Sequence, residues 1–301
     1  MGAYKKVEID YEDKIAKDYN AWYHQTPIQK YHARDFVKYI KKEMRKNDQV
    51  LDLGCGPASL WDELIKIKHI QLIGADVSPK MIQEARKFHP QGRFVVADSE
   101  KLLFKDEEFD VVICSSVLHH LPSPNKSLKE ITRVLKPYGT LIGREPQTDP
   151  FLKGVSPWLT GAIMGLVHLM RRREHHSPPK EPPIHKHHKC YDIKEFSDFV
   201  EKNNLVIQDI KSKFPFSSNF ADMRSRLGSR MILKVDKTLK NHKGNQFFYK
   251  AIKYGYGRKE IIFNVYQYLR ILEKESNKSS IKLAKILVWL ALGLDLALPK
   301  K

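Results

Sequence analysis

The chain has 301 residues, of which 42% are hydrophobic, so it can bury a sizeable core and is not wholly disordered. Its length fits one large domain, or one domain with a substantial appendage. The net charge of +18 is uneven, because residues 211–301 carry 20 Lys and Arg against 6 Asp and Glu, and the rest carries 33 against 29. The basic third favours an anionic partner (nucleic acid, an anionic membrane surface or an acidic substrate), although a solvated lysine-rich surface accounts for the charge equally well.

Three cysteines, Cys55, Cys114 and Cys190, are too few for a disulfide framework and predict a reducing compartment, the cytoplasm. The N-terminus continues into acidic residues instead of an apolar run, so no signal peptide is expected. The sequence leaves the oligomeric state open.

Residues 1–48 predict amphipathic helices rich in aromatic side chains. Phe36, Ile40 and Met44 recur at helical spacing. Such a segment either packs as part of the core or lies over a ligand cleft, and we interpret residues 1–48 as an N-terminal helical lid.

Beyond residue 48, short apolar runs alternate with helix-like segments. The predicted strands are 49–53, 70–75, 93–97, 109–114 and 141–145, and the predicted helices are 58–68, 79–87 and 125–135. Ser78 is the expected N-cap of the second helix, with Pro79 in its first turn. The alternation predicts an α/β fold with a doubly wound, mostly parallel, Rossmann-like sheet and helices on both faces.

Glycines and acids follow the first three strands, at the edge where such sheets bind ligands. Gly54 and Gly56 form a turn after the first strand that lets a ligand approach the backbone closely. Asp76 closes the second strand 20 residues after Gly56, and Asp98 closes the third. This spacing is typical of a nucleotide-binding βαβ unit, in which an acid on the second strand accepts hydrogen bonds from a ribose.

Five segments, in this order and spacing, carry a resemblance to a known family: 50–56, 74–81, 97–100, 109–112 and 135–139. Through them, residues 49–146 resemble the core of class I S-adenosylmethionine-dependent methyltransferases, in particular the type 11 group of small-molecule methyltransferases. One position departs from the family pattern, because Ala58 stands where the family usually has a third glycine. The resemblance implies an enzyme that takes its methyl group from S-adenosylmethionine.

The resemblance also implies roles for residues at this edge of the sheet. The glycine loop cradles the methionine part of the cofactor, and Asp52 interacts with its ammonium group. Asp76 accepts both ribose hydroxyls, and Asp98, with Ser99 beside it, accepts a hydrogen bond from the adenine amino group. The implied cofactor-binding set is Tyr19, Asp52, Gly54, Cys55, Gly56, Asp76, Val77, Asp98, Ser99 and Ser115.

The segment after the fourth predicted strand lies where the methyl group is expected to point. Ser115 and Ser116 would face the sulfonium, and His119 and His120 follow them. A histidine near its ordinary pKa is a natural base, so His120 is the first candidate for a catalytic base. Glu145, on the fifth strand, is the second candidate.

Two absent motifs narrow the choice of methyl acceptor. Segment 115–118 is not the Asn/Asp-Pro-Pro-aromatic motif of enzymes that methylate base or amide nitrogens. No Pro-Cys pair supplies the thiolate that cytosine-C5 chemistry needs. Nucleic acid is therefore the less favoured acceptor.

The remaining chain is predicted to form a lid, closing elements and an extension. Residues 147–190 hold an apolar segment followed by a proline- and histidine-rich loop, where no metal site is expected because a second thiolate is absent. Residues 191–236 add a helix at 191–200 and a strand at 205–210, with 230–235 left open between strand and helix. Residues 237–301 are interpreted as a basic helical extension, whose apolar run 286–298 is too short to span a membrane.

These observations predict a methyltransferase for a small-molecule or lipid-like acceptor, cytoplasmic, with an anionic membrane surface as a candidate partner for peripheral binding. One alternative is an RNA or protein methyltransferase that docks through the basic C-terminal third. Another is a non-catalytic partner subunit that keeps the cofactor fold. The acceptor itself is not predicted, because in this fold its specificity lies in the variable lid and C-terminal segments.

Overall fold

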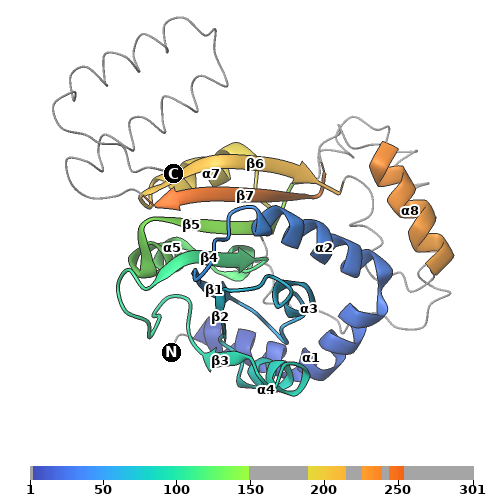
Figure 1. Ribbon diagram of the computed structural model, residues 1–301, viewed down its shortest axis with the longest axis horizontal. Helices are drawn as coiled ribbons and strands as arrows, with labels where there is room; N and C mark the ends of the chain where they lie inside the picture. Colours follow the sequence, from blue (N-terminus) through green and yellow to red (C-terminus); the bar gives the residue numbers. More distant parts are fainter. Residues whose placement is uncertain (1–2, 149–188, 215–225, 239–243, 254–301) are drawn as a thin grey trace, which may run out of the picture.

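The computed structural model describes residues 3–148, 189–214, 226–238 and 244–253. Within them, seven strands form one sheet in the order β3-β2-β1-β4-β5-β7-β6, stacked in Figure 1 from β6 at the top to β3 at the bottom. The strands are β1 (Gln49–Leu53), β2 (Gln71–Asp76), β3 (Arg93–Val96), β4 (Phe109–Ser115), β5 (Leu135–Pro146), β6 (Leu205–Lys213) and β7 (Gln246–Lys253). Strands β1 to β5 pair in parallel, and β7 is antiparallel to β5 and β6. The predicted α/β fold class is therefore confirmed.

The helices of the described residues alternate with the parallel strands along the chain. They are α1 (Ala3–Gln25), α2 (Pro27–Lys41), α3 (Trp61–Leu64), α4 (Pro79–Phe88), the 3-10 turn η1 (Leu118–His120), α5 (Asn125–Val134), α7 (Ile193–Glu201) and α8 (Arg226–Thr238). Segment 230–235, which the sequence left open, is thus helical. The predicted helices at 79–87 and 125–135 correspond closely to α4 and α5.

Two hydrophobic layers hold the helices on opposite faces of the sheet. On one face α5 and α7 pack against the strands through side chains such as Leu128 and Phe196. On the other face α2, α3 and α4 pack through Phe36, Trp61 and Ile82. Each such side chain contributes roughly 1.5–3 kcal/mol by leaving water. Neighbouring residues of β1 enter different layers, as expected for a parallel strand covered on both faces.

The helices that follow β1 and β2 begin differently. Ser78 caps α4 as predicted, because its Oγ accepts a hydrogen bond from the Met81 backbone N–H at 3.1 Å. The helix expected at 58–68 is wrong in its extent, since only Trp61–Leu64 is α-helical. Ala58 has a left-handed backbone with φ 61°, which no right-handed helix can include and which costs alanine about 1 kcal/mol. The same conformation explains why a glycine suits this position.

Strand β7 corrects the predicted C-terminal boundary. Residues from 237 onward were interpreted as a helical extension, but Gln246–Lys253 is an inner strand between β5 and β6. Lys253, within it, is almost fully buried, and its Nζ donates a hydrogen bond to the Leu135 carbonyl oxygen at 2.6 Å. The core therefore extends at least to residue 253.

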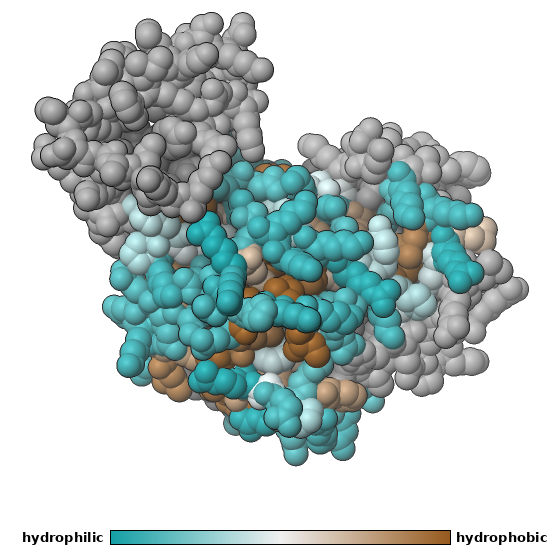
Figure 2. All heavy atoms as spheres, viewed as in Figure 1, coloured by the Kyte–Doolittle hydropathy of each residue, from teal (hydrophilic) through white to brown (hydrophobic). Residues whose placement is uncertain are grey.

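Hydrophilic side chains cover most of the face drawn in Figure 2, and hydrophobic residues show there as small areas between them. Among the described residues, the exposed large hydrophobic side chains are Ile65, Phe88, Val96, Leu103 and Met231. None of the helices described here is long and apolar enough to cross a bilayer. The apolar segments at 159–170 and 286–298 lie outside the described residues.

Candidate cofactor-binding site

A cavity of about 440 Å³ lies at the carboxyl ends of the parallel strands, bounded by α1 and by the loops after β1, β2, β3 and β4. It collects most of the residues predicted from the sequence. Those that line it are Tyr19, Asp52, Gly54, Cys55, Gly56, Asp76, Val77, Ser99, Ser115 and His120. Asp98 and Glu145 do not belong to the lining. The binding roles of all these residues stay predictions.

Asp76 ties the loops after β1 and β2 together. One carboxylate oxygen accepts the Gly56 backbone N–H at 2.8 Å, and the other accepts the Ser78 N–H at 2.9 Å. Burial raises the pKa of Asp76, and these two hydrogen bonds oppose the rise because they favour the carboxylate.

The two glycines of the loop serve different purposes. A Cβ on Gly54 would lie 2.2 Å from Cγ2 of Val117, so this glycine is needed for packing as well as for its positive φ. A Cβ on Gly56 would meet nothing within 4 Å, so the space beside this residue is open. Only Gly56 therefore supports the expectation that a ligand approaches the loop backbone closely.

Asp52 supplies an acceptor that the described protein groups leave unused. Its Oδ2 accepts a hydrogen bond from Trp61 Nε1 at 2.9 Å, whereas its buried Oδ1 has no hydrogen-bond partner among the described residues. Burial raises the pKa of Asp52 to about 7, although the Trp61 hydrogen bond lowers it. A buried acceptor without a partner is costly, so the site suits a cationic donor such as an ammonium group.

The structure does not bring Asp98 to the cavity, contrary to its expected contact with adenine. Its Oδ2 lies 2.5 Å from Nζ of Lys5 in α1, and its Oδ1 accepts the Glu100 N–H at 2.9 Å. Lys5 also pairs with Glu100. Asp98 instead helps to fasten α1, while the neighbouring Ser99 lines the cavity.

Glu145 and His119 form a buried pair behind the loop after β4. The Glu145 side chain is inaccessible to solvent, and its Oε1 accepts the backbone N–H groups of Val117 and Leu118. Its Oε2 lies 2.6 Å from His119 Nδ1. Because Oε1 accepts two N–H groups, we assign Oε2 of Glu145 as the acceptor of a hydrogen bond from the Nδ1–H group of His119. The ring of His119 lines the cavity, and burial lowers its pKa although Glu145 opposes this.

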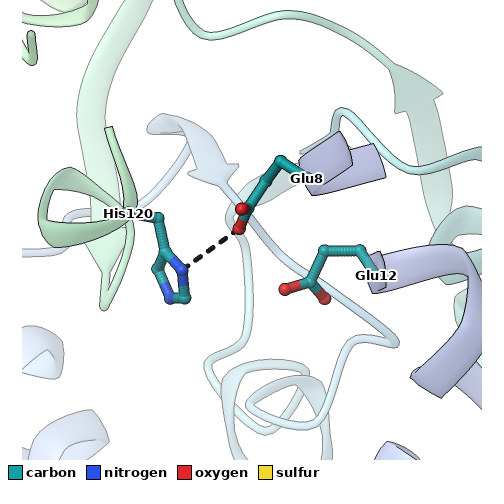
Figure 3. A group of neighbouring side chains, drawn as sticks. All are labelled: Glu8, Glu12 and His120. Carbon is teal, nitrogen blue, oxygen red and sulfur yellow. Dashed lines mark ion pairs between the residues drawn. The ribbon is translucent and has the colours of Figure 1, made fainter. Parts of the chain in front are cut away.

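His120, unlike His119, contacts helix α1. Figure 3 shows Glu8 and Glu12 of α1 directed toward its ring, and Nδ1 lies 3.2 Å from Oε1 of Glu8. Burial lowers the pKa of His120, but the hydrogen bond and charge of Glu8 outweigh burial, and the net pKa is raised. The ligand atoms of the three residues lie within 4.8 Å of one another, so they also have the donor types for a metal ion. The ion pair with Glu8 already joins the helix to the loop without one.

Three contacts fasten α1 across the strand ends. Besides the contacts of Lys5 and Glu8, Asp13 Oδ1 accepts a hydrogen bond from Ser78 Oγ at 2.5 Å. Tyr11, Glu12 and Tyr19 of the same helix face the cavity. Helix α1 therefore borders the cavity, whereas α2 packs on the sheet, and the lid role of residues 1–48 stays a prediction.

Comparisons with known proteins identify the family of the domain. Residues 51–143 match the family model for a methyltransferase domain. The chain is 32% identical over 141 residues to an uncharacterized protein of Methanocaldococcus jannaschii (46% of this chain, 63% of that protein). It is 30% identical over 116 residues to a ubiquinone/menaquinone biosynthesis C-methyltransferase of Rickettsia massiliae (35% and 47%), and 32% over 126 residues to a malonyl-[acyl-carrier protein] O-methyltransferase of Legionella pneumophila (40% and 43%). It thus spans less than two thirds of each relative.

Solved structures show the same fold at low identity. A methyltransferase in complex with the Trm112 activator of Haloferax volcanii gives a TM-score of 0.52 at 20% identity, over 83% of this chain and 98% of that one. The [4+2]-cyclase SpnF gives 0.51 at 18% identity, over 75% and 82%. These likenesses concern the fold alone.

Residues 51–143 therefore form a class I S-adenosylmethionine-dependent methyltransferase domain. Within that class the domain belongs to the type 11 group, and the predicted family and cofactor are confirmed for this domain.

Glu12, a half-buried acid of α1, predicts a pH-dependent stability. Burial raises the pKa of Glu12 to about 7, and the charges of Asp76 and Glu8 add to this, while His120 lowers it. Because the folded-state pKa is above the unfolded value, the stability contributed by this group falls as pH rises from about 4.5 to about 7. We expect Glu12→Gln to raise the free energy of unfolding at pH 8 by about 2 kcal/mol more than at pH 5.

Denaturant unfolding of both chains at the two pH values measures this difference. His119, whose pKa is lowered, acts in the opposite direction and is present in either chain. Glu12 is one of the charges that raise the pKa of His120, so the measured difference includes the change at His120 as well as the loss of Glu12. Asp10→Asn, at an exposed position of α1, is the matched control and should show no such difference. An equal effect of Glu12→Gln at both pH values would contradict the prediction.

Proposed function

We propose that this chain transfers a methyl group from S-adenosylmethionine to a small-molecule or lipid-like acceptor. The observation that carries the proposal is the cavity of the methyltransferase domain, with the Gly56–Asp76 contact and the unused Asp52 oxygen at its wall. One relative is named as a C-methyltransferase of ubiquinone and menaquinone biosynthesis, and another as a malonyl-[acyl-carrier protein] O-methyltransferase. These names support an acceptor of this class.

The residues present fit the cofactor. Asp52 Oδ1 offers a buried acceptor for the ammonium group, and the open space beside Gly56 leaves room along the loop. Asp76 is placed by two backbone N–H groups and lines the same cavity, as an acceptor of ribose hydroxyls requires. When bound, S-adenosylmethionine supplies an electrophilic methyl group on a sulfonium. Helix α1 shields this part of the cavity from water.

His119 is the residue best arranged as a base, in place of the expected His120. Glu145 accepts a hydrogen bond from Nδ1 of His119, and the ring lines the cavity, so Nε2 is the nitrogen that we assign to take a proton from an acceptor there. Its lowered pKa keeps the ring neutral at pH 7. His120 has a raised pKa and faces Glu8, so its ring is more often protonated near pH 7 and is less available to accept a proton. Glu145 acts as a positioning residue, since it does not line the cavity.

The cofactor site predicts a specific loss of binding. Asp76→Asn should weaken the binding of S-adenosylhomocysteine about tenfold or more, which is about 1.4 kcal/mol, because an amide is a poorer acceptor for ribose hydroxyls. Calorimetric titration measures the affinity. Asp209→Asn, on β6 and away from the cavity, removes the same charge and is the control. No binding to the unaltered chain, or equal binding to both variants, would overturn the proposed function.

The assignment of the base predicts a particular protonation state. At pH 7, His119 should be neutral with its proton on Nδ1, and His120 should titrate at higher pH than His119. Proton–nitrogen correlation NMR of the imidazole rings, assigned with His119→Gln and His120→Gln, measures both. Glu145→Gln should lower the pKa of His119 further, because the charge of Glu145 raises it. A proton on Nε2 of His119 in the unaltered chain would contradict the assignment.

The membrane aspect of the proposal rests on sequence alone, namely on the apolar run 286–298 beside a basic third. We expect the full chain to co-sediment with phosphatidylglycerol-containing vesicles and to bind phosphatidylcholine vesicles less. A chain ending at Ser280 should lose most of this binding. If the shortened chain binds equally well, or if steeply salt-dependent RNA binding is found instead, the nucleic-acid alternative gains support.

A further inference from the structure

A buried cation, Arg144, faces the cavity with no carboxylate of the described residues within ion-pair distance, although its charge lowers the pKa of Asp52 in the same cavity. Arg144 on β5 is only 8% exposed and belongs to the cavity lining. Its Nε donates a hydrogen bond to Ser115 Oγ at 2.8 Å, and its guanidinium lies over the Phe36 ring, 5.2 Å from the centroid. In the part of the chain that the structure describes, its two terminal nitrogens have neither a hydrogen-bond partner nor a carboxylate within ion-pair distance.

Burying an unpaired charge is unfavourable, so the arrangement points to a ligand. The contacts with Ser115 and Phe36 hold the guanidinium in place, and the residue lines the cavity. A guanidinium held in this way presents two parallel N–H donors, which match the two oxygens of a carboxylate or a phosphate. Since the side chain is already ordered, little conformational entropy is lost when an anion binds.

Arg144 contacts Ser115 but lies on the opposite side of the sheet order from most of the expected cofactor residues. The glycine loop, Asp76 and Ser99 follow β1, β2 and β3, whereas Arg144 lies beyond β4 on the other side of the sheet order. Gln246, the first residue of β7, pairs with Pro146 and lines the cavity on this side. Its buried Oε1 has no hydrogen-bond partner among the described residues. Because the oxygen and nitrogen of an amide can exchange places, Gln246 can also offer a donor here.

We propose that Arg144, assisted by Gln246, is the binding subsite for an anionic group of the methyl acceptor, either a carboxylate or a phosphate. The inference rests on the proposed function and restricts the acceptor to acidic small molecules or lipids. Arg144 is a specificity-determining residue in this assignment. The α-carboxylate of the cofactor has the same chemistry, and the experiment separates the two sources.

The test uses the full chain with saturating S-adenosylhomocysteine, titrated with inorganic phosphate and with acetate and followed by calorimetry. We expect at least one anion to bind, and Arg144→Met to weaken that binding about tenfold or more. Methionine keeps an apolar stem against Phe36, and Arg144→Lys, which keeps the charge without the fork, should weaken binding to an intermediate degree. Arg34→Gln removes an exposed arginine of α2 and controls for net charge, so it should leave anion binding unchanged. The affinity for S-adenosylhomocysteine should change less than about twofold in Arg144→Met.

Three outcomes would overturn the assignment. The first is that neither anion binds the unaltered chain. The second is that Arg144→Met binds anions as well as the unaltered chain does. The third is that Arg144→Met lowers the affinity for S-adenosylhomocysteine about tenfold, which would mean that the guanidinium binds the carboxylate of the cofactor. If S-adenosylhomocysteine does not bind at all, the proposed function fails, and the same titration without it still decides whether Arg144 forms an anion subsite.

Discussion

The contact on which the site depends is the one between Asp76 and the two loops at the carboxyl ends of β1 and β2. A single buried carboxylate accepts N–H groups from Gly56 and Ser78, so the turn after β1 and the start of α4 are fixed relative to each other. The hydroxyl of Ser78 in turn caps α4 and donates to Asp13 of α1. The loop after β1, helix α4 and helix α1 are thus joined through adjacent hydrogen-bonding groups. A change of charge at Asp76 would therefore alter the contacts of all three.

The cavity is electrostatically divided along the sheet. On the side of β1 to β3 its walls carry the carboxylates of Asp52 and Asp76, and α1 adds Glu8 and Glu12. On the side of β5 the buried charge is the guanidinium of Arg144. A cationic sulfonium and ammonium favour the first side, whereas an anion favours the second. Under the proposed function, the methyl donor and an anionic acceptor would therefore meet at the end of β4, where His119 lies.

The sequence predicted most of the parallel half of the sheet because each strand there is a continuous apolar run next to a glycine or an acid. It failed at β7, because Lys250 and Lys253 interrupt the apolar pattern, and the pairing of β7 with β5 joins segments about a hundred residues apart. The length of α3 depended on a backbone conformation at Ala58 that composition does not reveal. His119 and His120 are adjacent on a 3-10 turn, so only their partners, Glu145 and Glu8, distinguish them.

The fold alone does not decide the reaction, since a [4+2]-cyclase and a methyltransferase both share it with this chain. The side chains that we propose for the acceptor come, in the described part of this chain, from the loop after β4, from β5 and from β7, the strand that local sequence patterns did not reveal. The donor side is therefore built from local motifs that a sequence shows directly. The proposed acceptor side is built from long-range pairing, and for that reason its residues are brought together only in the folded chain.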